Sequence, residues 1–335
     1  MRDLVQDTAA DIIAPMATSH PLRPAAVYSF SLALFFAPTA ALAIGNCSFK
    51  PQPPVTLKNM GPCAFDPVSL SFAGDPAEQA RCLLTPVKPV GRLGQPLTQL
   101  PEVLAVRVGQ PAGLPDRDNL RRWLADRNLE DPLGASLVRK VAYARDNDPL
   151  SRPATYFVIH DTSSPNFGSL PWPRNIDADT KINNLNRYRC ANDIERAHVF
   201  ISRGGAVLLA HDFEVPWRAT KFEMATNFDG ALKGLFLHVE LIQPRRRDPK
   251  YGRGNDFLAP TPGFSPAQYD ALALIYVVAS VRAGFWMVPA FHAVLDEGIQ
   301  NKHDDPQNFE LDAFASSLSR LLKMLDAPVL REASQ

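Results

Sequence analysis

The sequence has few of the features that mark several protein classes. Four cysteines in 335 residues are too few for a scaffold held together by disulfides alone. None of the four lies in a CxxC pair, which argues against a zinc ribbon or a thiol redox motif. Thirty-five basic residues balance thirty-five acidic ones, so the chain is neither a generally basic nucleic-acid binder nor a generally acidic, solvating protein. No P-loop or GxGxxG fingerprint is present, so nucleotide chemistry has no support.

Its composition is otherwise that of a globular protein. Apolar residues make up 46% and charged residues 21%, so a hydrophobic core can form and wholesale disorder is not expected. A length of 335 residues allows about two domains. Thirty-one prolines against eighteen glycines indicate long irregular connections between regular elements.

An export signal stands near the start of the chain. The segment Tyr28–Ala43 is apolar and is interrupted by Pro38, so it falls short of the roughly 20 apolar residues that span a bilayer. It ends in the small-x-small pattern Ala41–Ala43, which is typical of a cleavage site. Met16 begins a better export signal than the first methionine does, and we expect translation to start there. We interpret residues 1–43 as a signal peptide, with a buried helix as the alternative. The mature protein would be periplasmic or secreted, with no transmembrane anchor after cleavage.

Export changes the meaning of the cysteines. In an oxidising compartment, Cys47, Cys63, Cys82 and Cys190 are expected to form disulfides rather than a metal site. Four cysteines allow three pairings, and the sequence does not choose among them. Three of the four lie in residues 44–113, which are rich in proline and glycine.

Residues 44–150 are predicted to be a disulfide-bearing, partly helical extension whose role the sequence does not define. Asp116 or Asp118 can cap a helix with an apolar stripe at helical spacing. A second amphipathic stretch is expected over residues 133–141. Turn signals at 147–153 then indicate a domain boundary.

The pattern changes after this boundary. Residues 151–330 mix short β-rich runs with helical stretches, which indicates an α/β domain with one mixed central sheet flanked by helices. The expected elements are a strand at 155–160, a hairpin of 198–201 and 206–210, a strand at 234–242, a helix from Ser265–Pro266 to about 283, and a helix at 311–325.

Two histidines and an acidic loop form a candidate metal site. His160 closes an apolar strand, where a rigid backbone can hold a ligand beside a cleft. His292 precedes the acidic loop 302–306. Two imidazoles and a carboxylate suit Zn²⁺, with water in its fourth position. Glu240 is an ionisable residue in an otherwise apolar strand, which favours a role as general base, and a salt-bridged strand residue is the alternative.

Five short segments are informative as a set. They are Phe157–Thr162, a strand that ends in a histidine; Ala197–Gly205, an AHxxIxRxG hairpin; Leu237–Leu241, an IGIEL-like strand; Phe264–Tyr269, the start of a helix; and His292 with Asp305–Pro306, a KxDPG-like loop. In this order they resemble the zinc-dependent N-acetylmuramoyl-L-alanine amidases, a fold shared with peptidoglycan recognition proteins and phage lysozyme amidases. The resemblance covers roughly half of the chain, from about Tyr156 to Phe309.

The resemblance implies a site and a chemistry. His160 and His292 would be zinc ligands, and Glu240 would be the catalytic acid and base. The chain also departs from the family pattern. The glycine after the Asp-Pro step is Gln307 here, and the tryptophan–histidine pair that often follows the hairpin is Trp217–Arg218.

Two registers compete for the third zinc ligand. Alignment on the Asp-Pro step makes Asp305 the ligand and places His303 at the family's lysine position, as the group that stabilises the oxyanion. Alignment on the Lys-x-Asp spacing makes Asp304 the ligand and keeps Lys302 in that role. We prefer Asp305 because the Asp-Pro step shapes the loop and Phe309 follows as in the family.

Two functions are compatible with this resemblance. The first is a zinc amidase that cleaves the amide bond between N-acetylmuramic acid and L-alanine in peptidoglycan or muropeptides. The second is a peptidoglycan-binding module of the same fold that has lost catalysis. The complete ligand set favours the enzyme. Residues 44–150 would dock on the catalytic domain or contact the wall. The basic run Pro244–Asp248 would be a solvated loop or touch an anionic wall polymer. No nucleic-acid partner is expected.

Overall fold

A computed structural model describes residues 55–57, 61–129, 133, 135–189, 197–251 and 258–326. All of these residues fall within one compact unit, Leu34–Gln335. The predicted signal peptide, the alternative start at Met16, and Cys47 and Cys190 lie outside the described residues.

The central element is a five-stranded mixed sheet. Its strands stand in the order β7 (Val207–Leu209), β6 (Val199–Ile201), β8 (Phe236–Leu241), β5 (Tyr156–Asp161) and β9 (Val288–Phe291). Strands β6, β8, β5 and β9 run parallel to one another. Strand β7 is antiparallel to β6, in the expected hairpin. Every residue of β5 and β8 is buried, as expected for parallel strands covered on both faces. The prediction of a mixed sheet flanked by helices is confirmed.

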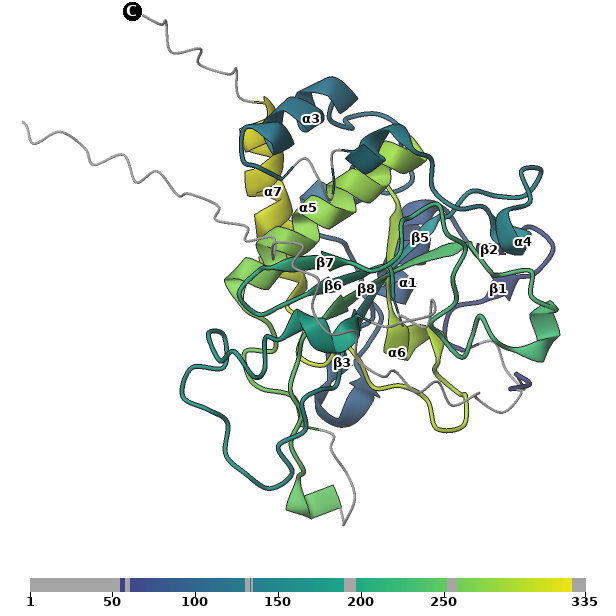
Figure 1. Ribbon diagram of the computed structural model, residues 1–335. Helices are drawn as coiled ribbons and strands as arrows, with labels where there is room; N and C mark the ends of the chain where they lie inside the picture. Colours follow the sequence, from purple (N-terminus) through teal and green to yellow (C-terminus); the bar gives the residue numbers. More distant parts are fainter. Residues whose placement is uncertain are drawn as a thin grey trace, which may run out of the picture. The chain divides into compact units, whose positions relative to one another are not determined.

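Two long helices pack together beside this sheet, and a shorter one lies against them (Figure 1). Helix α5 (Pro266–Ala283) begins with a capping box in which Ser265 and Gln268 bind each other's backbone N–H groups. It is buried nearly all round, because it lies between the sheet and α7 (Leu311–Asp326). Helix α3 (Arg117–Ala125) is capped by Asp116, as the sequence predicts, and contacts α7.

The residues before 150 pack directly on the sheet. The hydroxyl of Tyr156 on β5 accepts a hydrogen bond from Phe72 N at 3.0 Å and donates one to Gln79 at 3.0 Å. A disulfide joins Cys63 to Cys82, which confirms one of the expected disulfides. The short elements here are β1 (Phe65–Asp66), β2 (Ser71–Phe72), α1 (Pro76–Leu83), β3 (Val87–Lys88), β4 (Arg92–Leu93), α2 (Glu102–Ala105) and α4 (Ala144–Asn147).

Two features of the secondary structure differ from the predictions. The expected amphipathic helix at 133–141 is only a 3-10 turn, Ala135–Val138, in which Leu137 is buried and Val138 is 62% exposed. An isolated helix this short gains too little from packing to persist. Strand β9 was not predicted, because Pro289 interrupts a four-residue run. It is an edge strand, where proline is tolerated.

Among the described residues, none of the helices combines the length and the apolarity needed to span a bilayer.

Candidate metal centre

The candidate site lies at the carboxyl ends of three parallel strands. In the β5–β8 pair, His160 stands opposite Glu240. In the β5–β9 pair, Ile159 stands opposite Phe291, so His160 and His292 follow at neighbouring positions. His292 is the first residue of the short helix α6 (His292–Leu295), which begins where β9 ends. Ligands of open α/β sheets bind at this edge, and three of the predicted site residues meet there.

Two imidazoles and one carboxylate converge on a common point. His160 Nδ1 lies 2.8 Å from His292 Nδ1. Asp305 Oδ2 lies 3.1 Å from His292 Nδ1 and 3.7 Å from His160 Nδ1. All three side chains are buried, and the group can hold a metal ion.

The structure places Asp305, and not Asp304, beside the histidines. Asp305 Oδ2 also accepts a hydrogen bond from Asp161 N at 3.1 Å, which ties the carboxylate to the end of β5. Asp304 turns toward Gln307, whose Nε2 donates to it at 2.6 Å, and toward Arg245 at 3.5 Å. The geometry therefore matches the register that was built on the Asp-Pro step.

A second possible metal-binding group shares His292. It consists of His292, Asp296 and His303, and Asp296 Oδ2 lies 3.1 Å from His292 Nε2 and 2.7 Å from His303 Nδ1. A neutral imidazole has one lone pair and one N–H. If Nε2–H donates to Asp296, Nδ1 keeps the lone pair that faces His160 and Asp305. Asp296 is therefore best understood as the carboxylate that orients His292.

The surroundings of these groups shift their pKa values in the metal-free protein. Burial, followed by the charges of neighbouring histidines, lowers the pKa of His160 well below its usual value. Burial also acts to lower the pKa of His292, but Asp305 and Asp296 together raise it well above the usual value. Burial opposes ionisation of Asp305, yet the charge and hydrogen bond of His292 hold its pKa below normal. A neutral His160 and an ionised Asp305 are the forms that a metal needs, whereas a metal must displace the second proton of His292.

Glu240 is 8% exposed, and its charge acts on Tyr188, a tyrosine that the sequence did not single out. Burial raises the pKa of Tyr188, interactions with Thr162 and Ser164 oppose this shift, and the charge of Glu240 adds to it. Tyr188 therefore lies close enough to Glu240 to feel its charge, and its ring stacks on Phe200.

The two alternative oxyanion-stabilising residues have different surroundings. Lys302 forms an ion pair with Glu297. His303 stacks on His292, with ring centroids 4.1 Å apart, and its side chain remains 45% exposed. His303 therefore stands at the solvent side of the metal-binding group, whereas Lys302 is held by a carboxylate of the adjacent loop.

The basic run after β8 is not a fully solvated loop, because one of its arginines is buried. Arg245 is buried, and its Nη2 donates to both carboxylate oxygens of Asp161, at 2.8 and 2.7 Å. Burial raises the pKa of Asp161 to about 7, and the charge of Arg245 opposes this shift. Because the backbone N–H of Asp161 donates to Asp305, the Arg245–Asp161 pair helps to hold Asp305 in the metal-binding group. Arg246 lies over the Trp172 ring, 5.4 Å from its centroid.

Sequence reasoning missed three residues that shape this site. Asp296 stands four residues after His292 and pairs with it, a helical spacing that could have identified it. Arg245 was considered only as part of a basic run. No local pattern marks Tyr188, because tertiary structure alone brings it to Glu240.

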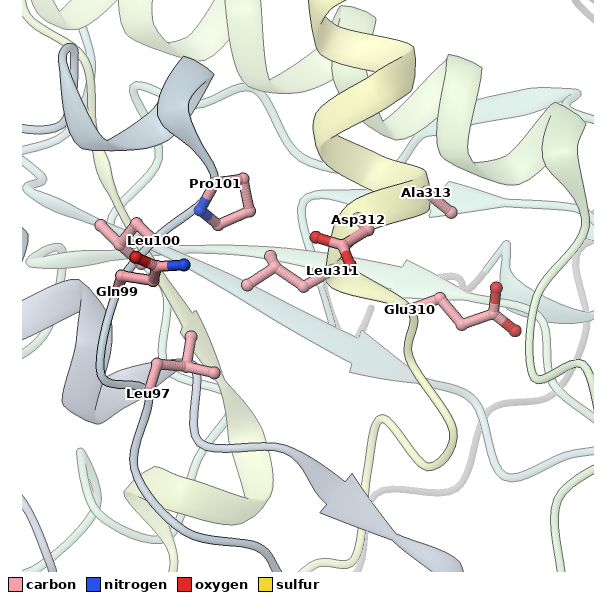
Figure 2. A pocket seen from close by; sticks show the side chains of 8 residues that line it. All are labelled: Leu97, Gln99, Leu100, Pro101, Glu310, Leu311, Asp312 and Ala313. Atoms are coloured by element: carbon pink, nitrogen blue, oxygen red, sulfur yellow. The ribbon is translucent and has the colours of Figure 1, made fainter.

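A cavity in the described part of the chain lies elsewhere. It has a volume of about 430 Å³ and no lining residue in common with the metal-binding group. Figure 2 shows its two walls, residues 97–101 on one side and the start of α7 on the other. Its two acidic residues, Glu310 and Asp312, have no histidine or cysteine partner among the lining residues.

Comparison of the chain with protein-family models, with curated proteins and with solved structures gave no match. What the site can do therefore follows from its own residues.

Proposed function

We propose that this protein is a zinc-dependent peptidoglycan hydrolase that cleaves the amide bond between N-acetylmuramic acid and L-alanine. One observation carries the proposal: His160, His292 and Asp305 converge within 3.7 Å, with Glu240 opposite His160 on the next strand. These are the four residues that the resemblance to the amidases requires, and they meet at one edge of the sheet.

The ligand set fits zinc in kind and in spacing. Zn²⁺ accepts imidazole nitrogen and carboxylate oxygen, usually in tetrahedral sites. Bonds of about 2.0–2.2 Å place tetrahedral ligand atoms roughly 3.3–3.5 Å apart. The three distances here, 2.8, 3.1 and 3.7 Å, bracket that value. Three protein ligands leave a fourth position open, which is typical of catalytic rather than structural zinc sites.

The reaction adds water across an amide, giving a carboxyl group on the lactyl ether of the sugar and a free amine on L-alanine. Zinc bound at this site would supply an acidified water and Lewis-acid polarisation of the amide carbonyl. Glu240 takes a proton from the attacking water and delivers it to the departing nitrogen, because its strand position places it beside the ligand His160.

The remaining groups hold this arrangement and stabilise charge. Asp296 orients His292, and the Arg245–Asp161 pair fixes Asp305 through the backbone N–H of Asp161. His303 stands at the open side, with Nδ1 bound to Asp296, so Nε2 is the nitrogen that a substrate would meet. Because Nδ1–H is donated to Asp296, Nε2 can donate a hydrogen bond only when the ring is an imidazolium, and in that form it would stabilise the oxyanion of the tetrahedral intermediate.

A location outside the cytoplasm is consistent with this substrate. Peptidoglycan lies outside the cytoplasm, and the disulfide Cys63–Cys82 is consistent with an oxidising location. The apolar segment that ends at Ala43 provides the route of export.

Metal analysis combined with mass spectrometry of digested muropeptides tests the proposal. We expect one zinc per chain and peptides that begin with free L-alanine. If the purified protein binds zinc and muropeptides but releases no such peptide, it is the recognition module that the sequence also allows. If it binds neither, the proposal fails.

A further inference from the structure

A second buried imidazole stands on the other edge of the His160 ring. His160 Nε2 lies 3.0 Å from His238 Nδ1. His238 is fully buried and sits two residues before Glu240 on β8, so both side chains project from the same face of the sheet. The resemblance to the amidases does not supply a role for it, since the IGIEL-like strand has glycine at this position.

The far nitrogen of His238 faces a carboxylate. His238 Nε2 lies 3.3 Å from Glu223 Oε2, and both side chains are fully buried. The nitrogen makes no hydrogen bond in the structure, so the carboxylate acts on the ring through its charge at this distance. Glu223 Oε2 accepts hydrogen bonds from Thr220 Oγ1 at 2.8 Å, Thr220 N at 3.0 Å and Ala219 N at 3.2 Å. An oxygen of an ionised carboxylate accepts hydrogen bonds and cannot donate one.

We infer that Glu223 and His238 are positioning residues that set which nitrogen of His160 faces the metal. The charge of the Glu223 carboxylate favours the proton of neutral His238 on Nε2, the ring nitrogen that faces it. His238 Nδ1 is then an acceptor, and it requires the proton of His160 to be on Nε2 as well. The lone pair of His160 is thereby left on Nδ1, the atom that faces His292 and Asp305.

The opposite pair of tautomers would block metal binding at His160 Nδ1. If His238 carried its proton on Nδ1, it would donate to His160 Nε2, and the proton of neutral His160 would lie on Nδ1, where a metal must bind. Outer partners of this kind fix the tautomer and orientation of a ligating histidine, and their loss typically costs roughly 10–100-fold in metal affinity. The inference rests on the metal site of the proposed function but not on the reaction.

The tautomers can be read directly in the metal-free protein. Long-range ¹H–¹⁵N correlation spectra of protein labelled with ¹⁵N-histidine, recorded with chelator present at a pH where both rings are neutral, distinguish Nδ1–H from Nε2–H rings. We expect His160 and His238 both to carry the proton on Nε2. An Nδ1–H tautomer at either residue overturns the inference. This measurement needs neither activity nor bound metal, so it stands even if the amidase proposal fails.

Variants then test whether the pair acts through the metal ligand. In His238→Asn, the side-chain oxygen replaces Nδ1 as acceptor, whereas in His238→Leu the acceptor is removed at similar size. Competition of Zn²⁺ against a chromophoric chelator should show a loss of about 10–100-fold for His238→Leu and for Glu223→Gln, and a smaller loss for His238→Asn. His198→Asn is the matched control, because the nitrogens of His198 bond only backbone groups, His238 N and Val215 O.

The outcomes separate the two claims. Equal zinc affinity in wild type, His238→Leu and Glu223→Gln overturns the role of the pair while leaving the metal site intact. No zinc binding by wild type overturns the proposed function and the metal-related part of the inference, and the tautomer spectra then decide only whether the pair places the proton of His160 on Nε2. If His238→Leu does not fold, Glu223→Gln and the wild-type spectra remain sufficient.

Discussion

His160 and Glu240 are both the penultimate residues of their strands, and they stand opposite each other in the parallel pair β5–β8. Neighbouring strands lie about 4.7–4.9 Å apart, so the backbone holds the proposed metal ligand and the proposed general base at adjacent positions. This placement is set by the strand register and does not depend on a loop.

The first prediction separates the two adjacent aspartates. Asp305→Ala should lower zinc affinity by more than the roughly 100-fold that an outer partner can cost, because a direct ligand is lost. Asp304→Ala should keep zinc, since Asp304 pairs with Gln307 and Arg245 instead. Zinc affinity of the two purified variants is the measurement. Loss of zinc in Asp304→Ala alone would show that the other register is correct.

The second prediction compares His303 with Lys302. His303→Ala should lower kcat by about 10²–10³-fold, the usual cost of one oxyanion donor, because His303 stacks on the ligand His292. Lys302→Ala should have little effect, since Lys302 is paired with Glu297. Steady-state kinetics on a defined muropeptide give both values. The reverse ranking would place Lys302 at the substrate.

Much of the sheet was predictable because its strands have a simple local signal. Strand β5 is an apolar run followed by His160 and Asp161, and β8 is apolar apart from His238 and Glu240. The start of α5 is indicated by Ser265 and Pro266. Strand β9 has no such signal, because only its edge position tolerates Pro289. Helix α1 was missed, although Asp75 and Glu78 form a capping box around Pro76.

In the candidate site, too, some residues were predictable from the sequence and others were not. His160 could be named as the end of an apolar strand, and His292 and Asp305 through the acidic loop and the family resemblance; the three meet in the structure. The supporting carboxylates could not be named, because Glu223 and Asp296 acquire their partners through tertiary packing. Only the four-residue spacing of Asp296 from His292 was visible beforehand.

The third prediction concerns the disulfide Cys63–Cys82. It closes a loop with a sequence separation of 19 residues, for which chain entropy predicts a stabilisation of about 3 kcal/mol. The double variant Cys63→Ala/Cys82→Ala should lose about this much free energy of unfolding in a denaturant titration. Its zinc affinity should stay near that of wild type, because neither cysteine touches the metal-binding group. An unchanged unfolding midpoint would show that the bond does not stabilise the native state.

The fourth prediction concerns the pH dependence of stability. Burial, followed by the charge of His238, lowers the pKa of His198 well below its usual value, and His211 and Arg282 act in the same direction. The unfolded chain protonates this residue near pH 6.5 and the folded protein does not. The free energy of unfolding should therefore fall as pH drops below about 6.5, by up to ~1.4 kcal/mol per pH unit for this one group.

Replacing His198 isolates this contribution. In urea titrations with chelator present, His198→Asn should show a smaller loss of stability between pH 7.5 and pH 5 than wild type, although it is less stable at pH 7.5. Parallel pH profiles for the two proteins would mean that His198 titrates alike in the folded and unfolded states.

The most direct test of the central claim is the activity of Glu240→Gln loaded with zinc. General acid–base catalysis typically contributes 10²–10⁴-fold, so release of peptides with free N-terminal L-alanine should slow by roughly that factor. Zinc content and melting temperature should match wild type, and Glu214→Gln, which alters an exposed partner of Arg139, should be fully active. A Glu240→Gln protein that binds zinc, melts normally and releases these peptides at the wild-type rate would contradict the account.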